Sequence, residues 1–179
     1  KLNNIFIKSD ESKIDSYKSM VKKYQDEYFK SEYNIQSTHK YFKKKSNKIP
    51  QKTLLRIMSE ISILRSLPQE WDASILINYS KDNINLMTSI VTGPKDTPYH
   101  NGLFEFHMYF PDTYPKNPPK VLIETNGNGK VRFNPNLYAG EGKVCLSLLG
   151  TWSGEGAEVW NNKSTSLQVL RSEEHTSEL

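Results

Sequence analysis

The sequence has few of the residues that build disulfide scaffolds, metal sites and membrane spans. One of its 179 residues is a cysteine, Cys145, which excludes an internal disulfide and a multi-cysteine zinc site. No window approaches the roughly 18 apolar residues that a membrane-spanning helix needs, so no membrane contact is expected. These absences favour the reducing cytoplasm, or the nucleus. No metal is expected either, because the four histidines lack metal-ligand spacing: His39, His100, His107 and His175.

The first fifty residues contain no arginine, but they hold 12 lysines against 6 acidic residues, a net charge of +6. The rest of the chain has a net charge of −2. A basic arm can bind nucleic acid. We favour instead a solvated, lysine-rich helix with no nucleic-acid partner, because apolar and aromatic residues there follow the 3-4-3-4 spacing of an amphipathic helix or short coiled coil. These residues are Ile14, Tyr17, Val21, Tyr24 and Tyr28.

The chain divides into one domain and two flanking segments. We assign residues 1–49 to a basic helical extension with a linker at Ser31–Lys48, and residues 50–170 to the domain. The start at Lys1, without Met or an apolar leader, is typical of an excised fragment. The tail 171–179, RSEEHTSEL, resembles translated adapter sequence, so we expect a domain cut short inside its last helix.

Hydrophobic periodicity predicts an α+β fold. Pro50 suits the first turn of a helix, and a broad apolar face follows until Pro68 ends it. The period then changes to two, with Phe106 and Met108 on one face and His107 on the other. Short connections favour an antiparallel meander, followed by a turn region and a C-terminal helix. The four expected strands are Ile75–Tyr79, Leu86–Thr92, Leu103–Phe110 and Lys120–Glu124.

A proline-rich stretch, PDTYPKNPP, separates the last two strands. Proline lacks an amide donor, so this stretch cannot be part of a sheet. We expect a rigid loop against which Tyr114 packs. Pro115 and Pro118 have the PxxP spacing of a polyproline ligand, which is the alternative.

Several familiar catalytic motifs are incomplete or absent. GNGKV lacks the spacing and the Ser or Thr of a phosphate-binding loop, and GEGAEV lacks the third glycine of a dinucleotide fingerprint. No serine lies in a G-x-S-x-G elbow. A Cys-His pair stays open, with His39, His100 or His107 as the partner of Cys145, although no cysteine-protease signature surrounds the cysteine.

Cys145 follows a turn rich in asparagine and glycine, so we expect an accessible thiol. A thiolate exchanges acyl groups with a thioester without a strong base, provided that a donor stabilises the developing oxyanion. The side-chain amide of Asn136, nine residues upstream, can be that donor. The alternative is structural: Cys145 is a small core residue and Asn136 a turn former.

Four stretches together resemble the ubiquitin-conjugating enzyme domain. They are Gly93-Pro94 with TPYHNGLF, then FPDTYPKNPP, then FNPNLYAGEGKVCLSLL, and the LQVL after Trp160. Their order and spacing match the family from Trp71 to Leu170. The chain resembles in particular the large hybrid conjugating enzyme/ligases, which include the giant inhibitor-of-apoptosis conjugating enzyme. Those proteins carry a longer tryptophan-containing loop after the cysteine, here GTWSGEGAEVW.

The resemblance implies a role for each matching residue. Cys145 matches the cysteine that forms the family's thioester, and Asn136 matches the oxyanion donor that ends its His-Pro-Asn motif. Asn134 replaces the histidine of that motif, with Pro135 between them. Since that histidine is usually given a structural role, activity is expected to survive. Pro98 and Tyr99 fall in the loop that usually contacts activating enzymes and ligases.

One role of the family has no clear counterpart in the sequence. The residue that helps to deprotonate the incoming lysine stays unassigned. The candidates for it are Ser153, Glu155 and Ser164.

The function that the resemblance implies is ubiquitin conjugation. Cys145 would accept ubiquitin from an activating enzyme and pass it to a lysine of a protein substrate, with a ligase as a further partner. The activating enzyme consumes the ATP, so no cofactor is expected. Two alternatives stay open: a catalytically silent binding module of the same fold, and an enzyme for another ubiquitin-like modifier. Cys145 and Asn136 together favour an enzyme over a silent module.

Overall fold

The computed structural model describes residues 15–16, 19–20, 23, 37–44, 48–68, 74–80, 82–100 and 102–175. The apolar stripe predicted in the N-terminal extension lies outside these residues, as do Trp71 and residues 176–179. Within the described part of the chain, no helix has the length and apolar character needed to cross a membrane. In the same part, no cluster of three His, Cys, Asp or Glu residues is placed to hold a metal ion.

Helix α2 spans Gln51–Ser66, between the two prolines that the sequence marks as its limits. Ile57, Ile61 and Leu64 point into the core and are 0–5% exposed. The broad apolar face predicted for this helix is only partly buried, because Leu55 and Met58 are 60% and 52% exposed. A narrower stripe than the sequence predicts therefore holds α2 to the sheet.

The sheet contains the four predicted strands in the order β1-β2-β3-β4, and every neighbouring pair is antiparallel. This arrangement confirms the α+β fold and the meander. The register places His107 opposite Thr88 and Leu122, and Met108 opposite Met87 and Val121. The strands are β1 Ile75–Ser80, β2 Asn83–Thr92, β3 Leu103–Tyr109 and β4 Lys120–Ile123.

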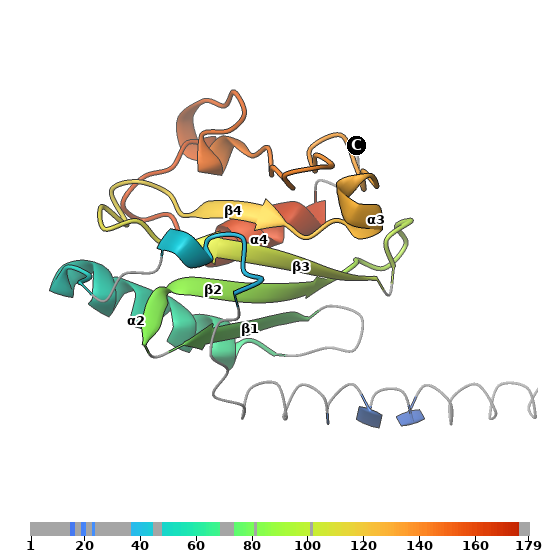
Figure 1. Cartoon of the computed structure of the whole chain (residues 1–179), viewed down its shortest axis with the longest axis horizontal. Helices are drawn as coiled ribbons and strands as arrows, with labels where there is room; N and C mark the ends of the chain where they lie inside the picture. The colour runs from blue at the N-terminus through green and yellow to red at the C-terminus, as the bar shows by residue number, and fades with distance from the viewer. Residues whose placement is uncertain are drawn as a thin grey trace, which may run out of the picture.

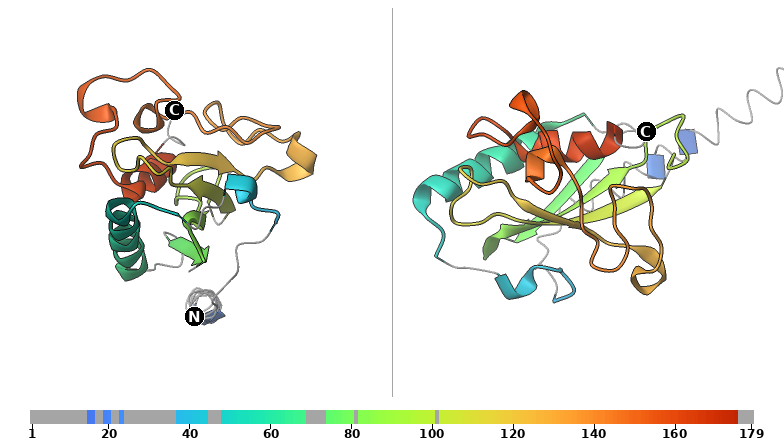
Figure 2. Two further views of the ribbon diagram at one scale, coloured as in Figure 1. Left: turned by 60° about the vertical axis from the view of Figure 1, so that its left-hand side comes forward. Right: turned by 90° about the horizontal axis from the view of Figure 1, so that it is seen from above.

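Both long helices cover the same face of the sheet. Figures 1 and 2 show α2 and α4, which spans Ser166–His175, together on one side of the strands. Phe106 and Met108 of β3 face these helices and are 2% and 0% exposed. We call the opposite face of the sheet the outer face. It was expected to face solvent.

Residues 37–44, which the sequence analysis assigns to a linker, contact the outer face (Figure 2). This segment, called the strap, includes the 3-10 turn η1, Phe42–Lys44. Its His39 ring stacks on His107 with centroids 4.4 Å apart, and Lys40 pairs with Glu124 at 3.2 Å. His107, expected on a solvent-facing row, is therefore only 4% exposed.

The proline-rich stretch is a loop between β3 and β4, as predicted. Tyr114 is 2% exposed and packs edge-on against Phe110, and Trp160 donates its indole N–H to the carbonyl of Pro115 at 2.8 Å. Pro119 is buried and Pro118 is partly buried. The loop is thus part of the folded domain, which disfavours the interpretation as a polyproline ligand.

A buried carboxylate joins α2, α4 and the proline-rich loop. Glu60 is 3% exposed, and Tyr114 donates its hydroxyl to Oε1. The Arg56 Nε–H donates to the same oxygen at 2.7 Å, while the amide and hydroxyl of Ser166 donate to Oε2. Both carboxylate oxygens are therefore occupied, which is what a buried charge requires.

Candidate active site

The turn before Cys145 is organised by the side chain of Asn134. Its Oδ1 accepts the backbone N–H groups of Asn136 and Leu137 at 2.8 and 2.9 Å. This geometry is an Asx turn, in which a side-chain oxygen takes the place of a backbone carbonyl. The residue that replaces the motif's histidine thus has a structural role of its own.

The turn and the cysteine segment form one hydrogen-bonded unit. The Cys145 N–H donates to the carbonyl of Asn136 at 2.9 Å, and the Tyr138 N–H donates to the carbonyl of Lys143 at 2.9 Å. Leu137 and Val144 form an antiparallel bridge between them. Asn136 and Cys145, nine residues apart in sequence, are consequently neighbours in space.

Gly142 lets this unit lie against the sheet. Its φ is +77°, and a Cβ there would meet the carbonyl oxygen of Ile123 at 2.0 Å. Its carbonyl accepts the Ile123 N–H at 2.8 Å. Only glycine combines this backbone conformation with so close an approach.

The side chain of Asn136 is half-buried and, among the described residues, forms no hydrogen bond. Asn134 rather than Asn136 is therefore the turn former. An amide that the fold does not use for its own turn can donate to a developing oxyanion. This difference between the two asparagines argues against the purely structural alternative for Asn136.

Cys145 is buried, with 4% of its surface exposed, so the expectation of an accessible thiol is wrong for this conformation. Its neighbours Val144 and Leu146 are 0% and 8% exposed. Burial by itself fits a structural cysteine. If Cys145 reacts, neighbouring side chains must first move aside.

A histidine partner for the thiol is not present in the described part of the chain. Cys145 forms no hydrogen bond to a described histidine, and the ring nitrogens of His39 and His107 have partners in the strap, in β2 and in β3. His39 Nδ1 accepts the Tyr41 N–H, and its Nε2 faces the carbonyl of Met87 at 3.2 Å. His107 Nδ1 accepts the Lys40 N–H. The Cys-His alternative is therefore disfavoured.

The loop after the cysteine, residues 150–160, folds back toward it. A Cβ on Gly154 would lie 2.3 Å from the Cβ of Ser147, which is two residues beyond Cys145. The same Cβ would lie 3.1 Å from a Glu158 carboxylate oxygen. Glu158 is an acidic group near this segment that the sequence reasoning did not select.

The three candidates for assisting lysine deprotonation differ in their exposure to solvent. Ser153 and Glu155 are exposed on the 150–160 loop. Ser164 is 4% exposed, its hydroxyl accepts the Asn161 N–H at 3.0 Å, and its carbonyl accepts a guanidinium N–H of Arg56. Ser164 therefore connects α2 to the segment before α4.

The predicted partner-contact residues differ in exposure. Pro98 is exposed, whereas Tyr99 is half-buried and donates its hydroxyl to the carbonyl of Phe133 at 2.6 Å. The rings of Tyr99 and Phe104 meet edge-on, with centroids 5.8 Å apart. Tyr99 thus joins its loop to the active-site turn, and partner contact at this loop stays a prediction.

Arg132 is a residue of the site that the sequence reasoning missed. Its Nε–H donates to the carbonyl of Asn134 at 3.2 Å, and its guanidinium lies 4.4 Å from the centre of the Tyr138 ring. A second N–H donates to the carbonyl of Pro135. The signal in the sequence was weak, a single arginine two residues before the turn.

The chain is similar to known proteins over most of its length. The sequence profile of the family described as ubiquitin-conjugating enzyme matches residues 56–175. The chain is 48% identical over 116 residues to a probable ubiquitin-conjugating enzyme of Caenorhabditis elegans, covering 64% of this chain and 16% of the relative. It is 49% identical over 111 residues to the human dual E2 ubiquitin-conjugating enzyme/E3 ubiquitin-protein ligase BIRC6, covering 62% of this chain and 2% of the relative.

A solved structure supports the fold independently. A ubiquitin conjugating enzyme E2 of Plasmodium vivax superposes with a TM-score of 0.54 at 23% identity, covering 68% of this chain and 98% of that one. The chain therefore spans nearly all of a small solved member but a minor part of the larger curated relatives.

Proposed function

The chain belongs to the ubiquitin-conjugating enzyme family, and we propose that it carries ubiquitin as a thioester on Cys145 and transfers it to a substrate lysine. One observation carries the proposal. The backbone bond of 2.9 Å between Cys145 and Asn136 holds the chain's one cysteine next to Asn136, whose side-chain amide has no hydrogen-bond partner among the described residues.

The first step is an exchange of thioesters. The Cys145 thiolate attacks the carbonyl carbon that joins ubiquitin to its activating enzyme, and the activating enzyme leaves as a thiolate. One C–S bond forms as another breaks, so the step is nearly balanced in energy. The thiol must become accessible for this step, because Cys145 is 4% exposed.

The second step forms the isopeptide bond. A neutral lysine amine attacks the thioester carbonyl, a C–N bond forms, and Cys145 leaves as a thiolate. The amine gives its proton to solvent or to a carboxylate of the 150–160 loop, where Glu155 and Glu158 lie. The Asn136 amide donates to the oxyanion of the tetrahedral intermediate, and Asn134 holds the turn that presents it.

The proposal implies a set of partners. They are ubiquitin, an activating enzyme that consumes the ATP, a protein substrate and a ligase. Exposed Pro98 and the loop that Tyr99 anchors form the expected contact for the activating enzyme or ligase. The cytoplasm or the nucleus is the compartment that we propose, and no cofactor enters either step.

A charging assay tests the proposal. The chain is incubated with activating enzyme, ATP and each of a panel of ubiquitin-like modifiers, and is then separated with and without reductant. We expect a reductant-sensitive adduct of one ubiquitin. Cys145→Ser should give a reductant-stable oxyester or nothing, and Cys145→Ala should give nothing.

Two outcomes would contradict the proposal. Reductant-sensitive charging that survives in Cys145→Ala would move the reaction away from this residue. A folded chain that binds ubiquitin but is never charged with any modifier would favour the silent binding module. Charging with another modifier in place of ubiquitin would keep the chemistry and change the cargo.

A further inference from the structure

Arg132 is an exposed residue that hydrogen-bonds to two carbonyls of the turn before Cys145. Its Nε–H donates to the carbonyl of Asn134 at 3.2 Å, and a second N–H of the guanidinium donates to the carbonyl of Pro135. A planar guanidinium presents its donors as a rigid fork, so one group can fix the direction of both carbonyls. Arg132 therefore holds the two peptide units that lead into Asn136.

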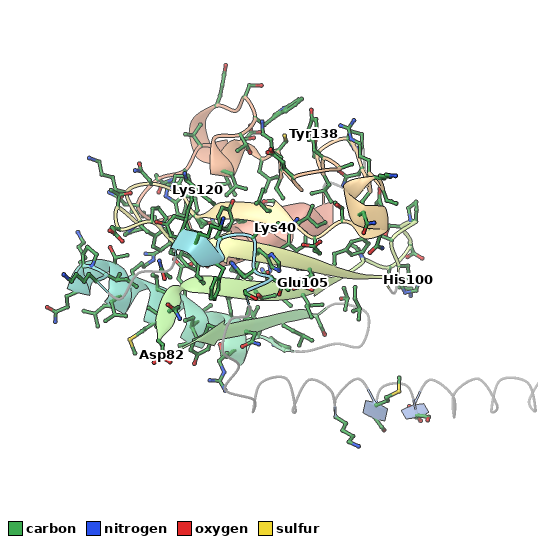
Figure 3. All side chains as sticks on the ribbon, viewed as in Figure 1. Lys40, Asp82, His100, Glu105, Lys120 and Tyr138 are labelled. Carbon is green, nitrogen blue, oxygen red and sulfur yellow. The ribbon has the colours of Figure 1, made fainter. Side chains whose placement is uncertain are left out.

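The ring of Tyr138 holds the guanidinium in place. The Arg132 guanidinium lies 4.4 Å from the centre of this ring, within the range of a cation–π contact. The Tyr138 N–H donates to the carbonyl of Lys143 at 2.9 Å, two residues before Cys145. Figure 3 shows Tyr138 past β4, the strand at the edge of the sheet. Tyr138 thus connects Arg132 to the segment that carries the cysteine.

The backbone around Asn136 is fixed on both sides. In the peptide unit that precedes it, the Pro135 carbonyl accepts from Arg132 and the Asn136 N–H donates to Oδ1 of Asn134 at 2.8 Å. The carbonyl of Asn136 accepts the Cys145 N–H at 2.9 Å. The side chain of Asn136, in contrast, forms no hydrogen bond to the described residues. The fold therefore orients the backbone of this residue and leaves its amide available.

Arg132 and Asn134 hold opposite edges of the same peptide unit. Asn134 accepts its N–H, whereas Arg132 donates to its carbonyl. A peptide unit is planar, and one hydrogen bond lets the plane tilt about the bonded atom. Two bonds on opposite edges prevent this tilt. Because the tilt of this plane sets the direction of the Asn136 side chain, both anchors are needed to aim the amide.

We propose that Arg132 is a positioning residue for ubiquitin transfer, because it holds the peptide unit that aims the Asn136 amide at the oxyanion. The inference rests on the proposed function and deepens it by assigning a further residue to the same step. Arg132 acts through Asn136 and not through its own charge. Oxyanion donors work because they are preorganised, and a misplacement of about 1 Å can lower a rate by about 10².

Hydrogen exchange tests the first part of this inference without ubiquitin. The Asn136 and Leu137 amides should exchange about two- to tenfold faster in Arg132→Ala than in wild type, which corresponds to the net contribution of one hydrogen bond. NMR spectroscopy of the uncharged chain measures these rates. Lys130→Ala, an equal loss of charge at an exposed residue, should leave them unchanged. Equal exchange in Arg132→Ala and wild type would contradict a role of Arg132 in the turn.

Single-turnover discharge to free lysine tests the effect on the reaction. Discharge should slow about three- to tenfold in Arg132→Ala, less than for loss of the oxyanion donor itself, with charging and the melting temperature little changed. Arg132→Lys keeps the positive charge without the planar fork and should slow discharge nearly as much. Full activity in Arg132→Lys would assign the effect to charge and contradict positioning by the fork.

Tyr138 offers a second pair of variants, which leave Arg132 in place. Tyr138→Phe keeps the ring face and should discharge ubiquitin at the wild-type rate. Tyr138→Leu removes the cation–π contact and should slow discharge about two- to fivefold, as the strength of an exposed contact of this kind implies. Equal rates for these two variants would contradict the role of the ring in holding Arg132.

A double variant distinguishes positioning from a structural or electrostatic role. When Asn136→Ala has already removed the amide, Arg132→Ala should slow discharge no further, because no donor is left to aim. A residue that acted by its own charge or by general stability would slow discharge by the same factor in both backgrounds. Equal factors would therefore overturn the inference.

The outcomes separate this inference from the proposed function. A wild-type chain that is never charged would overturn the proposed function, and the inference with it. Normal charging with unchanged discharge in Arg132→Ala would overturn the inference alone. Unchanged discharge in Asn136→Ala would also overturn it, since Arg132 would then have nothing to position. Slower discharge in Arg132→Ala that disappears in the Asn136→Ala background would support both.

Discussion

The Glu60 cluster and the turn before Cys145 each contain a polar side chain, and the two differ in burial: Glu60 is 3% exposed, whereas Asn136 is half-buried. Both carboxylate oxygens of Glu60 accept hydrogen bonds, from Arg56, Tyr114 and Ser166. The side chain of Asn136 accepts and donates none among the described residues. Glu60 therefore connects elements of the fold, whereas the Asn136 side chain is available for another interaction.

The difference separates structural from reactive polar groups. Glu60 is buried and needs its partners, because a buried polar group without them lowers stability. Asn136 is only half-buried, so its amide remains available to a ligand or a transition state. The turn itself contains both kinds of side chain, because Asn134, two residues before Asn136, has a structural role. Its Oδ1 has two donors, whereas Asn136 contributes only backbone groups to the turn.

The largest effect on stability is expected at Glu60. Glu60→Ala removes the acceptor for Tyr114 and Ser166 and leaves the Arg56 charge without its partner, so we expect a loss of about 3–5 kcal/mol in the free energy of unfolding. Urea denaturation of purified protein measures it. Glu141→Ala, a matched change at an exposed glutamate, should stay within about 0.5 kcal/mol of wild type. Equal losses for the two variants would remove the structural role of the cluster.

A smaller loss is expected at Asn134. Asn134→Ala removes the acceptor of the Asn136 N–H and one of the two acceptors of the Leu137 N–H, which keeps the backbone carbonyl of residue 134. Each full bond contributes about 0.5–1.5 kcal/mol, so the free energy of unfolding should fall by roughly 1–2 kcal/mol. Asn134→Asp places a carboxylate oxygen where the amide oxygen was, so this variant should retain most of the wild-type stability. A fully stable Asn134→Ala variant would mean that the turn holds without its side chain.

The effect expected at the strap emerges only as the pH falls. Burial, together with the charge of neighbouring His107, lowers the pKa of His39 from 6.5 to about 4, so the folded chain keeps this ring neutral. Between these values the unfolded chain binds more protons, and the stability contributed by His39 is therefore lost as the pH falls from 6.5 toward about 4.

A variant at His39 separates the effect of its protonation from that of nearby carboxylates such as Glu105. His39→Gln should show less loss of thermal stability over the same pH range than wild type. If the melting temperatures of the two proteins fall equally with decreasing pH, the result would contradict a neutral, buried His39 and with it the docked strap.

Much of the fold could be predicted from the sequence, because it depends on local patterns. The twofold period of β3, the prolines around α2 and the turn residues before Cys145 identified elements whose bounds the structure confirms within a few residues. The strap could not be predicted. Its contacts join His39 to Met87 and His107 across many residues of chain, and no local period encodes such pairs.

The proximity of the candidate site residues could be predicted from the sequence and their environment could not, and their catalytic roles stay predictions. Cys145 and Asn136 were selected correctly as neighbours, since the bond between their backbones joins them. The burial of the thiol, the turn-forming role of Asn134 and the support from Arg132 depend on side-chain packing around the turn. Sequence spacing fixes which residues meet, and packing decides how exposed each one is.

The central claim is that the Asn136 amide acts in the reaction while Asn134 acts in the fold. Single-turnover discharge of ubiquitin from Cys145 to free lysine, measured beside a melting curve, tests it in Asn136→Ala and Asn134→Asp. Loss of one oxyanion donor typically lowers a rate by about 10²–10³, so discharge in Asn136→Ala should slow at least about tenfold with charging less affected and the melting temperature preserved. Asn134→Asp should discharge near the wild-type rate. Unchanged discharge in a stably folded Asn136→Ala variant would contradict the account and leave Cys145 as its one catalytic residue.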